Sequence, residues 1–113
     1  MAISFDAIGE KYVTFAAGEN AEAGKVCKVD AEQTVNACAQ GDAFCGVIAN
    51  VRGDAAAVIM GGYTEIVYSG SVPGYGYVKL AADANGGVKA DDGGREYLVV
   101  HVDETNGMIG LFL

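Results

Sequence analysis

Glycine is the residue that most limits what this chain can fold into. Seventeen glycines are spread over 113 residues, and no stretch shows the i, i+3, i+4, i+7 spacing of non-polar residues that marks an amphipathic helix. Glycine in a helix interior costs up to about 1 kcal/mol relative to alanine, so helices are disfavoured along nearly the whole chain. Short segments rich in valine, isoleucine, tyrosine and phenylalanine remain, separated by glycine, aspartate and asparagine, a pattern typical of a β-sandwich or barrel.

The length and the spacing of these segments predict one small all-β domain. A chain of 113 residues has the size of a single domain, and its 51% hydrophobic content is enough for a core. We therefore expect a single-domain β-barrel or sandwich. The expected strands are Tyr12 to Ala17, Lys25 to Asp30, Thr34 to Cys38, Ala43 to Val51, Ala56 to Met60, Thr64 to Tyr68, Tyr77 to Ala81, Val88 to Ala90, Tyr97 to Asp103 and Met108 to Leu113.

An internal repeat becomes visible when residues 23–51 are laid over residues 73–102. Lys28-Val29 then aligns with Lys79-Leu80, and further along the chain Val35 aligns with Val88. Two copies are too few for a solenoid. We expect one closed or nearly closed structure of two related meanders, about 23–60 and 73–113, within a β domain of residues 19–113. The long strands align Phe44 with Tyr97 and Val47 with Val100, and the matched positions predict one core formed by Cys27, Phe44, Val47, Val78, Leu80, Tyr97, Val99 or Val100, and Leu111.

The first eighteen residues precede both copies and are predicted to form an N-terminal arm, residues 1–18. A free tail would be polar. This segment is instead rich in large non-polar side chains, so we expect it either to add a strand to its own sheet or to dock on another chain. The residues concerned are Ile3, Phe5, Ile8, Tyr12, Val13 and Phe15.

The stretch "YSGSVPGYGYVKL", residues 68–80, contains the only proline of the chain and several glycines. Proline fixes φ and glycine permits positive φ, so this stretch predicts a turn that leads into a strand. A phosphate-binding loop is disfavoured because no helix follows the glycines. Alternation along the strand places Tyr75, Tyr77 and Lys79 on one face, which is either an ordinary surface or a protein contact, since tyrosine is enriched at interface hot spots.

The charge balance excludes some classes of partner. The chain has 7 Lys+Arg against 15 Asp+Glu, a net charge of −8, and shows no cluster of basic residues. Nucleic acids and anionic membranes are therefore disfavoured as partners. Neither a signal peptide nor a membrane-spanning segment is recognisable, and we expect the protein to be made and kept in a cytosol.

Catalytic and metal-binding patterns are not recognisable in this sequence. Cys27, Cys38 and Cys45 form no CxxC motif and lie among small or non-polar residues, which predicts buried free thiols. A zinc site or a nucleophile pairing a cysteine with His101 is the disfavoured alternative. Asp91-Asp92 and Asp103-Glu104 adjoin glycine-containing turns, which favours turn chemistry over acid/base catalysis. We expect a protein that is not an enzyme and needs no cofactor or metal.

At the level of whole segments the sequence resembles the bacteriophage capsid decoration proteins, also called capsid cement proteins. The resemblance is carried by the non-polar N-terminal arm, by "AGKVCKV" and "TVNACAQGDAFCGVI", and by "VYSGSVPGYGYVKLAADANGGVKADDGGREYLVVHVDE". It implies a small all-β protein, commonly a homotrimer, that is made in the bacterial host cytoplasm. The protein would bind the major capsid protein on the outer surface of the phage head, the virion location of this family, and stabilise the head. The capsid-contacting arm would correspond to residues 1 to about 15.

The sequence is also compatible with two other functions. One is a small soluble binding module for a glycan or peptide, with Tyr63, Tyr68, Tyr75 and Tyr77 as an aromatic platform. The other is a cysteine-dependent redox enzyme, which would require a thiol with a pKa well below its ordinary value. For the decoration hypothesis, the predicted partner-binding residues are Ile3, Phe5, Ile8, Tyr12, Tyr75, Tyr77 and Lys79.

Overall fold

A computed structural model of the chain describes residues 10–113, which form ten β-strands and no helix. The predicted all-β class is confirmed, and each of the ten expected strands overlaps an observed one. The strands are β1 (Lys11–Ala17), β2 (Val26–Ala31), β3 (Thr34–Ala37), β4 (Gly46–Arg52), β5 (Ala55–Gly61), β6 (Tyr63–Ser69), β7 (Gly76–Ala82), β8 (Val88–Ala90), β9 (Arg95–Asp103) and β10 (Met108–Phe112).

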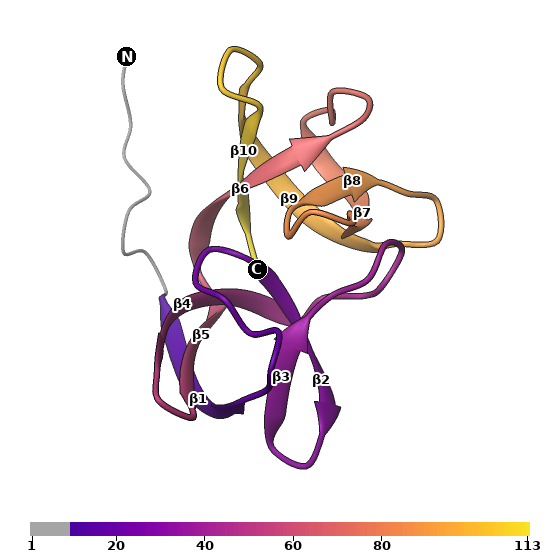
Figure 1. Ribbon diagram of the computed structural model, residues 1–113. Coiled ribbons are helices and arrows are strands. Elements are labelled where there is room, and N and C mark those ends of the chain that lie inside the picture. Colours follow the sequence, from indigo (N-terminus) through magenta and orange to yellow (C-terminus); the bar gives the residue numbers. More distant parts are fainter. Residues whose placement is uncertain (1–9) are drawn as a thin grey trace.

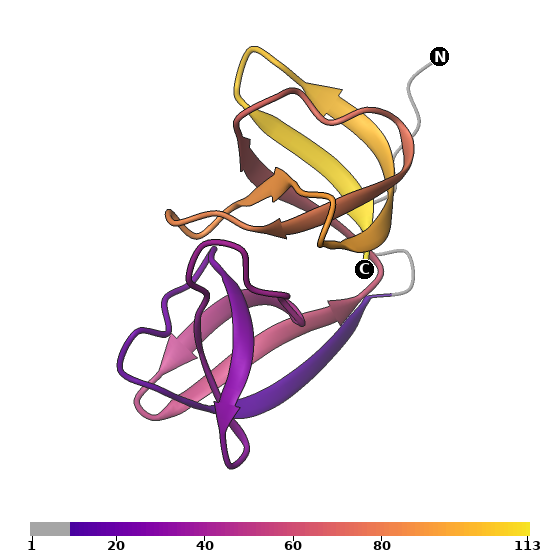
Figure 2. The same cartoon turned by 90° about the vertical axis from the view of Figure 1, so that its right-hand side faces the viewer.

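The strands form two closed barrels of five strands each, one below the other in Figure 1 and again separate in the turned view of Figure 2. The first barrel has the order β1-β3-β2-β4-β5, and the second has the order β10-β6-β8-β7-β9. Because the second barrel is closed, its order can also be read as β6-β8-β7-β9-β10, so β6 to β10 take the places of β1 to β5. In both barrels the first strand pairs in parallel with the third, and the other pairs are antiparallel. The two related meanders therefore close into two barrels, and the single closed structure that we expected is not formed.

The first strand of the chain belongs to the repeat. In the first barrel Tyr12 is paired with Ile59, and in the second barrel Tyr63 is paired with Phe112 in the same position. The repeat thus begins at β1, and residues 11–17 are an integral strand between β5 and β3. Of the two alternatives for the arm, residues 11–17 follow the first, because they add a strand to their own sheet and close the first barrel. The β domain therefore includes β1 and does not begin after residue 18. The rest of the predicted arm, with Ile3, Phe5 and Ile8, lies outside the described residues.

The long strands of the two barrels align in a register that differs from the predicted one. Ile48 pairs with Val58, and Val99 pairs with Leu111 at the corresponding place, each next to a β-bulge. Val47 therefore corresponds to Leu98, and its predicted equivalence to Val100 is wrong. The cause is the connection before the strand, which is longer in the first barrel than in the second (residues 38–45 against 91–94). Phe44 lies in that connection, outside the strand predicted from Ala43.

The buried side chains form two clusters, where one core was expected. The first cluster fills the first barrel, and Cys27 belongs to it; its fully buried members are Cys27, Val35, Ile48, Ala56 and Val58. The second cluster fills the second barrel and extends across the junction into the first. It contains Val26, Cys38, Phe44, Val47, Ile66, Leu80, Ala82, Val88, Tyr97, Val99, Ile109 and Leu111, with Val78 packed against it.

The junction between the barrels is made of backbone hydrogen bonds as well as side-chain packing. The Val26 amide donates to the Gly86 carbonyl at 2.9 Å. The Gly41 amide donates to the Ala82 carbonyl, and the Ala82 amide donates to the Asp42 carbonyl, both also at 2.9 Å. Strand-like pairing of this kind holds the 38–45 connection of the first barrel against the end of β7 in the second.

The proline and glycines of residues 68–80 form the predicted turn into a strand. Residues 70–75 connect β6 to β7, and β7 begins at Gly76. Gly70 and Gly76 have φ values of 75° and 85°, in the left-handed region that glycine adopts without a steric cost. These glycines therefore have the structural role that the sequence predicted.

Candidate functional site

The candidate site is the exposed side of β7 in the second barrel together with Tyr75, which precedes the strand; Tyr75, Tyr77 and Lys79 are all exposed. Tyr75 and Tyr77 are 71% and 72% exposed, the highest values among the large hydrophobic residues that the structure describes as exposed. Val78 packs against the core, and Leu80 is fully buried. The alternation predicted for this strand is confirmed, and it brings together three of the predicted partner-binding residues.

A shallow hollow of about 440 Å³ lies beside Tyr77 and Lys79 and is closed on its other side by Asp91 and Asp92. Asp91 Oδ1 accepts a hydrogen bond from the Gly93 amide at 2.8 Å, and Asp91 Oδ2 lies 3.4 Å from Lys89 Nζ. The Gly93 amide and, second, Lys89 lower the pKa of the Asp91 carboxyl. The hollow is therefore lined by the ring of Tyr77, the exposed amine of Lys79 and the hydrogen-bonded carboxylate of Asp91. Such a combination of aromatic and charged groups is suited to contact with another protein.

The position of this face in the repeat distinguishes it from an ordinary surface. Tyr77 pairs with Leu98, and the equivalent pair in the first barrel is Val26 with Val47. Val26 and Val47 are 0% and 7% exposed because they pack into the cluster of the second barrel. The face that joins the first barrel to the second is therefore covered, whereas the equivalent face of the second barrel is open and carries Tyr77.

The surface of the second barrel that contacts this face also has a counterpart in the first barrel. Ala82 of the second barrel is fully buried and pairs with Val88, and its backbone bonds to Gly41 and Asp42 across the junction. Its counterpart in the first barrel is Val29, which pairs with Val35 and is 51% exposed. Within residues 10–113, the surface around Tyr77 and the surface around Val29 are therefore exposed, whereas their counterparts are buried against each other at the junction.

Tyr12 lies apart from the other predicted residues, on β1 of the first barrel. Its side chain is 54% exposed, and its hydroxyl donates to Glu10 Oε2 at 3.4 Å. Its counterpart in the second barrel, Tyr63, is only 9% exposed and packs edge-on against Phe112 at 5.6 Å between ring centroids. The structure does not gather Tyr12 and Tyr77 into one surface, since they belong to different barrels.

The four-tyrosine platform of the binding-module hypothesis is not formed as expected. Tyr63 is buried, and Tyr68 is half-buried against the core of the second barrel. Of these four tyrosines, Tyr75 and Tyr77 are the two that are largely exposed. The predicted inclusion of Tyr63 is wrong because the second barrel uses its ring for internal packing.

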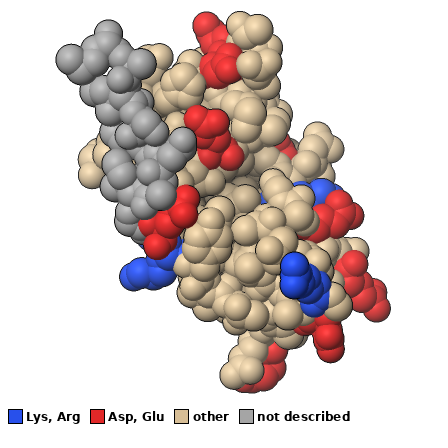
Figure 3. Space-filling view, turned by 90° about the vertical axis from the view of Figure 1, so that its left-hand side faces the viewer, with Lys and Arg blue, Asp and Glu red and all other residues tan. Residues whose placement is uncertain are grey.

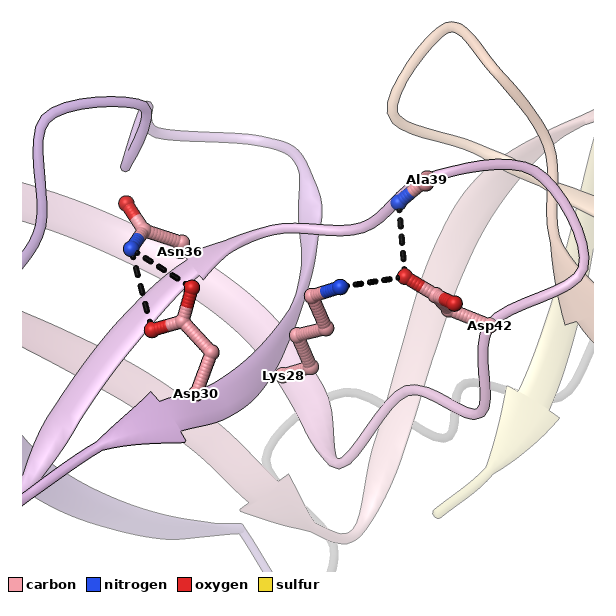
Figure 4. A network of polar contacts seen from close by, with 5 residues as sticks. All are labelled: Lys28, Asp30, Asn36, Ala39 and Asp42. Atoms are coloured by element: carbon pink, nitrogen blue, oxygen red, sulfur yellow. Dashed lines mark hydrogen bonds and ion pairs between the residues drawn. The ribbon is translucent and has the colours of Figure 1, made fainter.

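A polar network in the first barrel, shown in Figure 4, was not predicted from the sequence. Lys28 Nζ contacts Asp42 Oδ2 at 2.6 Å, and the Ala39 amide donates to the same oxygen at 2.8 Å. Beside it the Asn36 amide group donates to both oxygens of Asp30, at 3.0 and 2.9 Å. Lys28 and, second, the Ala39 amide lower the pKa of the Asp42 carboxyl, and Asp42 raises the pKa of Lys28.

This network borders an open hollow of about 460 Å³ whose lining includes Lys25 and Glu22. Lys25 Nζ is paired with Glu22 Oε2 at 3.1 Å, so both lysines of the lining have acidic partners. Charges that neutralise each other in this way hold the local structure and leave no unpaired cation among the lining residues for an anionic ligand. We assign the network to holding the 38–45 connection in place.

The cysteines are only partly as predicted. Cys27 and Cys38 are buried, at 0% and 9% exposure, but Cys45 is only half-buried. The Cys27 and Cys45 sulfurs lie 3.9 Å apart. All three cysteines belong to the first barrel, whereas His101 lies on β9 of the second.

One residue of each acidic pair singled out in the sequence accepts hydrogen bonds within its own turn. Asp91 accepts from the Gly93 amide, and Asp103 accepts from the Asn106 amide at 3.2 Å and from its side chain at 2.8 Å. These bonds lower the pKa of both carboxyl groups. The prediction of turn chemistry for Asp91 and Asp103 is confirmed.

Within residues 10–113, no three histidine, cysteine, aspartate or glutamate side chains lie close enough together to hold a metal ion. The same part of the chain contains no helix with the length and apolar character needed to cross a bilayer. On the side of the molecule shown in Figure 3, acidic side chains are spread over both barrels. In comparisons with known proteins, no family model and no curated protein matches the chain.

Proposed function

We propose that the protein is a structural capsid decoration protein of a bacteriophage head, which assembles through its two barrels and binds the major capsid protein on the outer surface of the head. The observation that supports assembly most directly is the repeat of the junction: Tyr77 and Leu98 occupy the place of Val26 and Val47 on an open face. A protein contact accounts for such a face better than a small ligand, because the equivalent face already binds a barrel.

A second copy of the chain is the occupant that best fits this face. The first barrel docks on the second, and the second barrel has the same topology as the first. A face like that of Val26 and Val47 should therefore fit a first barrel from another copy, with Tyr77 meeting the exposed Val29. This contact is heterologous, since the two surfaces differ, and such contacts close into rings when the rotation permits. The homotrimer implied by the family resemblance is one such closed ring.

Attachment to the coat protein is proposed for the segment that precedes β1. Ile3 and Phe5 alternate with Ala2, Ser4 and Asp6, and Ile8 follows three positions after Phe5. A peptide with large non-polar residues at alternate positions is suited to adding a strand to an exposed sheet edge. The proposal thus assigns self-association to the barrels and attachment to residues 1 to 9, so the two functions can be tested separately.

The self-association test uses two variants that damage opposite sides of the contact. Tyr77→Ala and Val29→Asp should each weaken oligomerisation at least about tenfold, the typical effect of losing an interface hot spot. Equal amounts of the two variants, when mixed, should form a dimer, because one chain keeps an intact Tyr77 face and the other keeps an intact Val29 surface. Light scattering coupled to size-exclusion chromatography measures the mass of each sample. Val67→Ala, an exposed valine on β6, is the matched control and should leave the mass unchanged.

The attachment test uses co-sedimentation with expanded heads of the phage that encodes the chain. Deletion of residues 2–9 should abolish sedimentation with heads and leave the oligomer mass unaltered, because β1 begins only at Lys11. Undiminished binding by the truncated protein would overturn the assignment of the segment. A chain that binds no heads under any condition, yet binds a glycan array in a manner lost in Tyr75→Ala, would favour the binding-module alternative.

A further inference from the structure

Cys27 and Cys45 lie side by side at the start of two neighbouring strands. Cys27 on β2 is paired in register with Gly46, the first residue of β4, and Cys45 immediately precedes Gly46. The Cys45 amide donates to the Cys27 carbonyl at 2.8 Å, so the two backbones are held together at this point. The two sulfur atoms are 3.9 Å apart, and Cys27 Sγ also contacts the Gly46 carbonyl oxygen at 3.6 Å.

We propose that Cys27 and Cys45 are a site of reversible oxidation, where a low-molecular-weight disulfide such as glutathione disulfide converts the two thiols into an intramolecular disulfide bond. The sulfurs must approach by about 2 Å to reach the bonded distance, a movement within the range of side-chain rotation. The backbones need no new neighbour, because β2 and β4 already pair here.

The two thiols differ in access, which sets the order of the steps. Cys45 is half-buried and Cys27 is fully buried, so an external disulfide reaches Cys45 first. The hydrogen bond from Cys27 lowers the pKa of the Cys45 thiol to about 7, which provides thiolate near neutral pH. The same hydrogen bond, together with burial, raises the pKa of Cys27.

The reaction is an ordinary pair of thiol–disulfide exchanges. The Cys45 thiolate attacks one sulfur of glutathione disulfide, forms a mixed disulfide and releases one glutathione, which takes up the proton that Cys45 has lost. Cys27 then loses its proton and attacks the Cys45 sulfur, and a second glutathione leaves with that proton. The protein loses two electrons and two protons, and one glutathione disulfide becomes two glutathione molecules.

The disulfide bond would stabilise the junction between the barrels. It would close the chain between residues 27 and 45, and this segment contains the connection whose Phe44 packs into the second barrel. Cys45 is the next residue after Phe44. Tying Cys45 to β2 restricts the unfolded chain and holds the connection in place, so the oxidised form should be the more stable one.

The test uses the full-length reduced protein, incubated with glutathione disulfide and analysed by intact mass spectrometry. The wild-type protein should lose the mass of two hydrogens, and peptide mapping should locate the bond between Cys27 and Cys45. Cys27→Ser should instead retain one glutathione on Cys45. Cys38→Ala, the matched control, should form the bond at the wild-type rate. The melting temperature of the oxidised wild type should rise by roughly 5 °C or more, and dithiothreitol should reverse both changes.

Two outcomes would overturn the proposal without depending on any variant. One is wild-type protein that stops at the glutathione adduct, and the other is a bond that maps to Cys38. Alkylation of the native protein gives an independent readout, since Cys45 should react before Cys27 and Cys38. Equal protection of all three thiols would also count against the proposal.

Discussion

Tyr97 of the second barrel stacks on Phe44 of the first, with ring centroids 4.8 Å apart and ring planes inclined by 12°. The Tyr97 hydroxyl donates to the Phe44 carbonyl oxygen at 3.1 Å. Both rings are buried, at 5% and 3% exposure, and Arg95 lies over Tyr97 at 5.4 Å from the ring centroid. Two residues that the sequence alignment treated as equivalent are in fact partners across the junction.

The first prediction concerns this pair. Phe44→Ala should lower the free energy of unfolding by about 3–5 kcal/mol, since it leaves a cavity at the junction. Tyr97→Phe keeps the ring but removes the hydroxyl, and should cost about 1 kcal/mol. Urea denaturation followed by circular dichroism measures both values. A Phe44→Ala protein as stable as the wild type would show that the junction contributes nothing to folding.

Two glycines form a matched pair for the second prediction. A Cβ at Gly46 would meet the carbonyl oxygen of Ile59 and lie 2.8 Å from Val58 Cγ1, whereas a Cβ at Gly74 would meet no atom within 4 Å. Gly46→Ala should therefore cost about 1–3 kcal/mol, because the backbone of β5 must move. Gly74→Ala should change stability by no more than about 0.5 kcal/mol. Thermal melts of both variants are sufficient for the comparison.

The sequence predicted the strands well because each strand and each turn is specified locally. Val26–Ala31 and Met108–Phe112 are short β-rich runs, and Gly70 and Gly76 occupy turns that require positive φ. The closure into two barrels could not be predicted from such local patterns. It depends on β1 pairing with β5, a contact between segments far apart in the chain, and the alignment of repeats beginning at residue 23 left β1 out.

In the candidate site, too, the locally specified features could be predicted from the sequence and the features that depend on distant contacts could not. The exposure of Tyr75, Tyr77 and Lys79 follows from strand alternation, so it could be predicted. The equivalence of that face to the face at the junction could not be predicted, since it depends on the burial of Val26 and Val47 against a second barrel. The contact of Lys28 with Asp42 and that of Cys27 with Cys45 join β2 to the connection before β4, and no local pattern specifies that packing.

The third prediction concerns acid stability. Lys28 and the Ala39 amide lower the pKa of Asp42, so the native state binds this proton less readily than the unfolded chain. The stabilisation is present above the unfolded pKa of about 4 and is lost as the pH falls through the lower native value. Wild-type stability should therefore drop more between about pH 5 and pH 2 than that of Asp42→Asn.

Asp91 and Asp103 also have lowered pKa values and contribute in the same direction, so Asp42→Asn should retain part of the acid sensitivity. Urea denaturation at several pH values separates the contributions. Parallel pH curves for the wild type and Asp42→Asn would show that the contact with Lys28 is not maintained in solution.

The last prediction concerns Asp83, a carboxylate that is only 4% exposed at the junction end of β7. Its Oδ1 accepts from the Asn85 and Gly87 amides at 2.7 and 3.0 Å, and its Oδ2 accepts from Ser69 Oγ at 2.9 Å. Asp83→Ala removes the acceptor of all three donors, and should cost about 1–3 kcal/mol for each donor left buried without a partner. Ser69→Ala removes only one donor, and should cost about 1 kcal/mol.

The turn that Asp83 holds contains Gly86, whose carbonyl accepts the hydrogen bond from Val26 in the first barrel. Asp83→Ala should therefore loosen the junction as well as the turn, because the position of Gly86 is no longer fixed. Hydrogen exchange monitored by NMR should show faster exchange of the Val26 amide in Asp83→Ala than in Ser69→Ala. The Val58 amide, within the first barrel, reports on global unfolding in both variants. If the exchange rates of the Val26 and Val58 amides rise by the same factor in Asp83→Ala, Asp83 stabilises the whole fold and has no separate role at the junction.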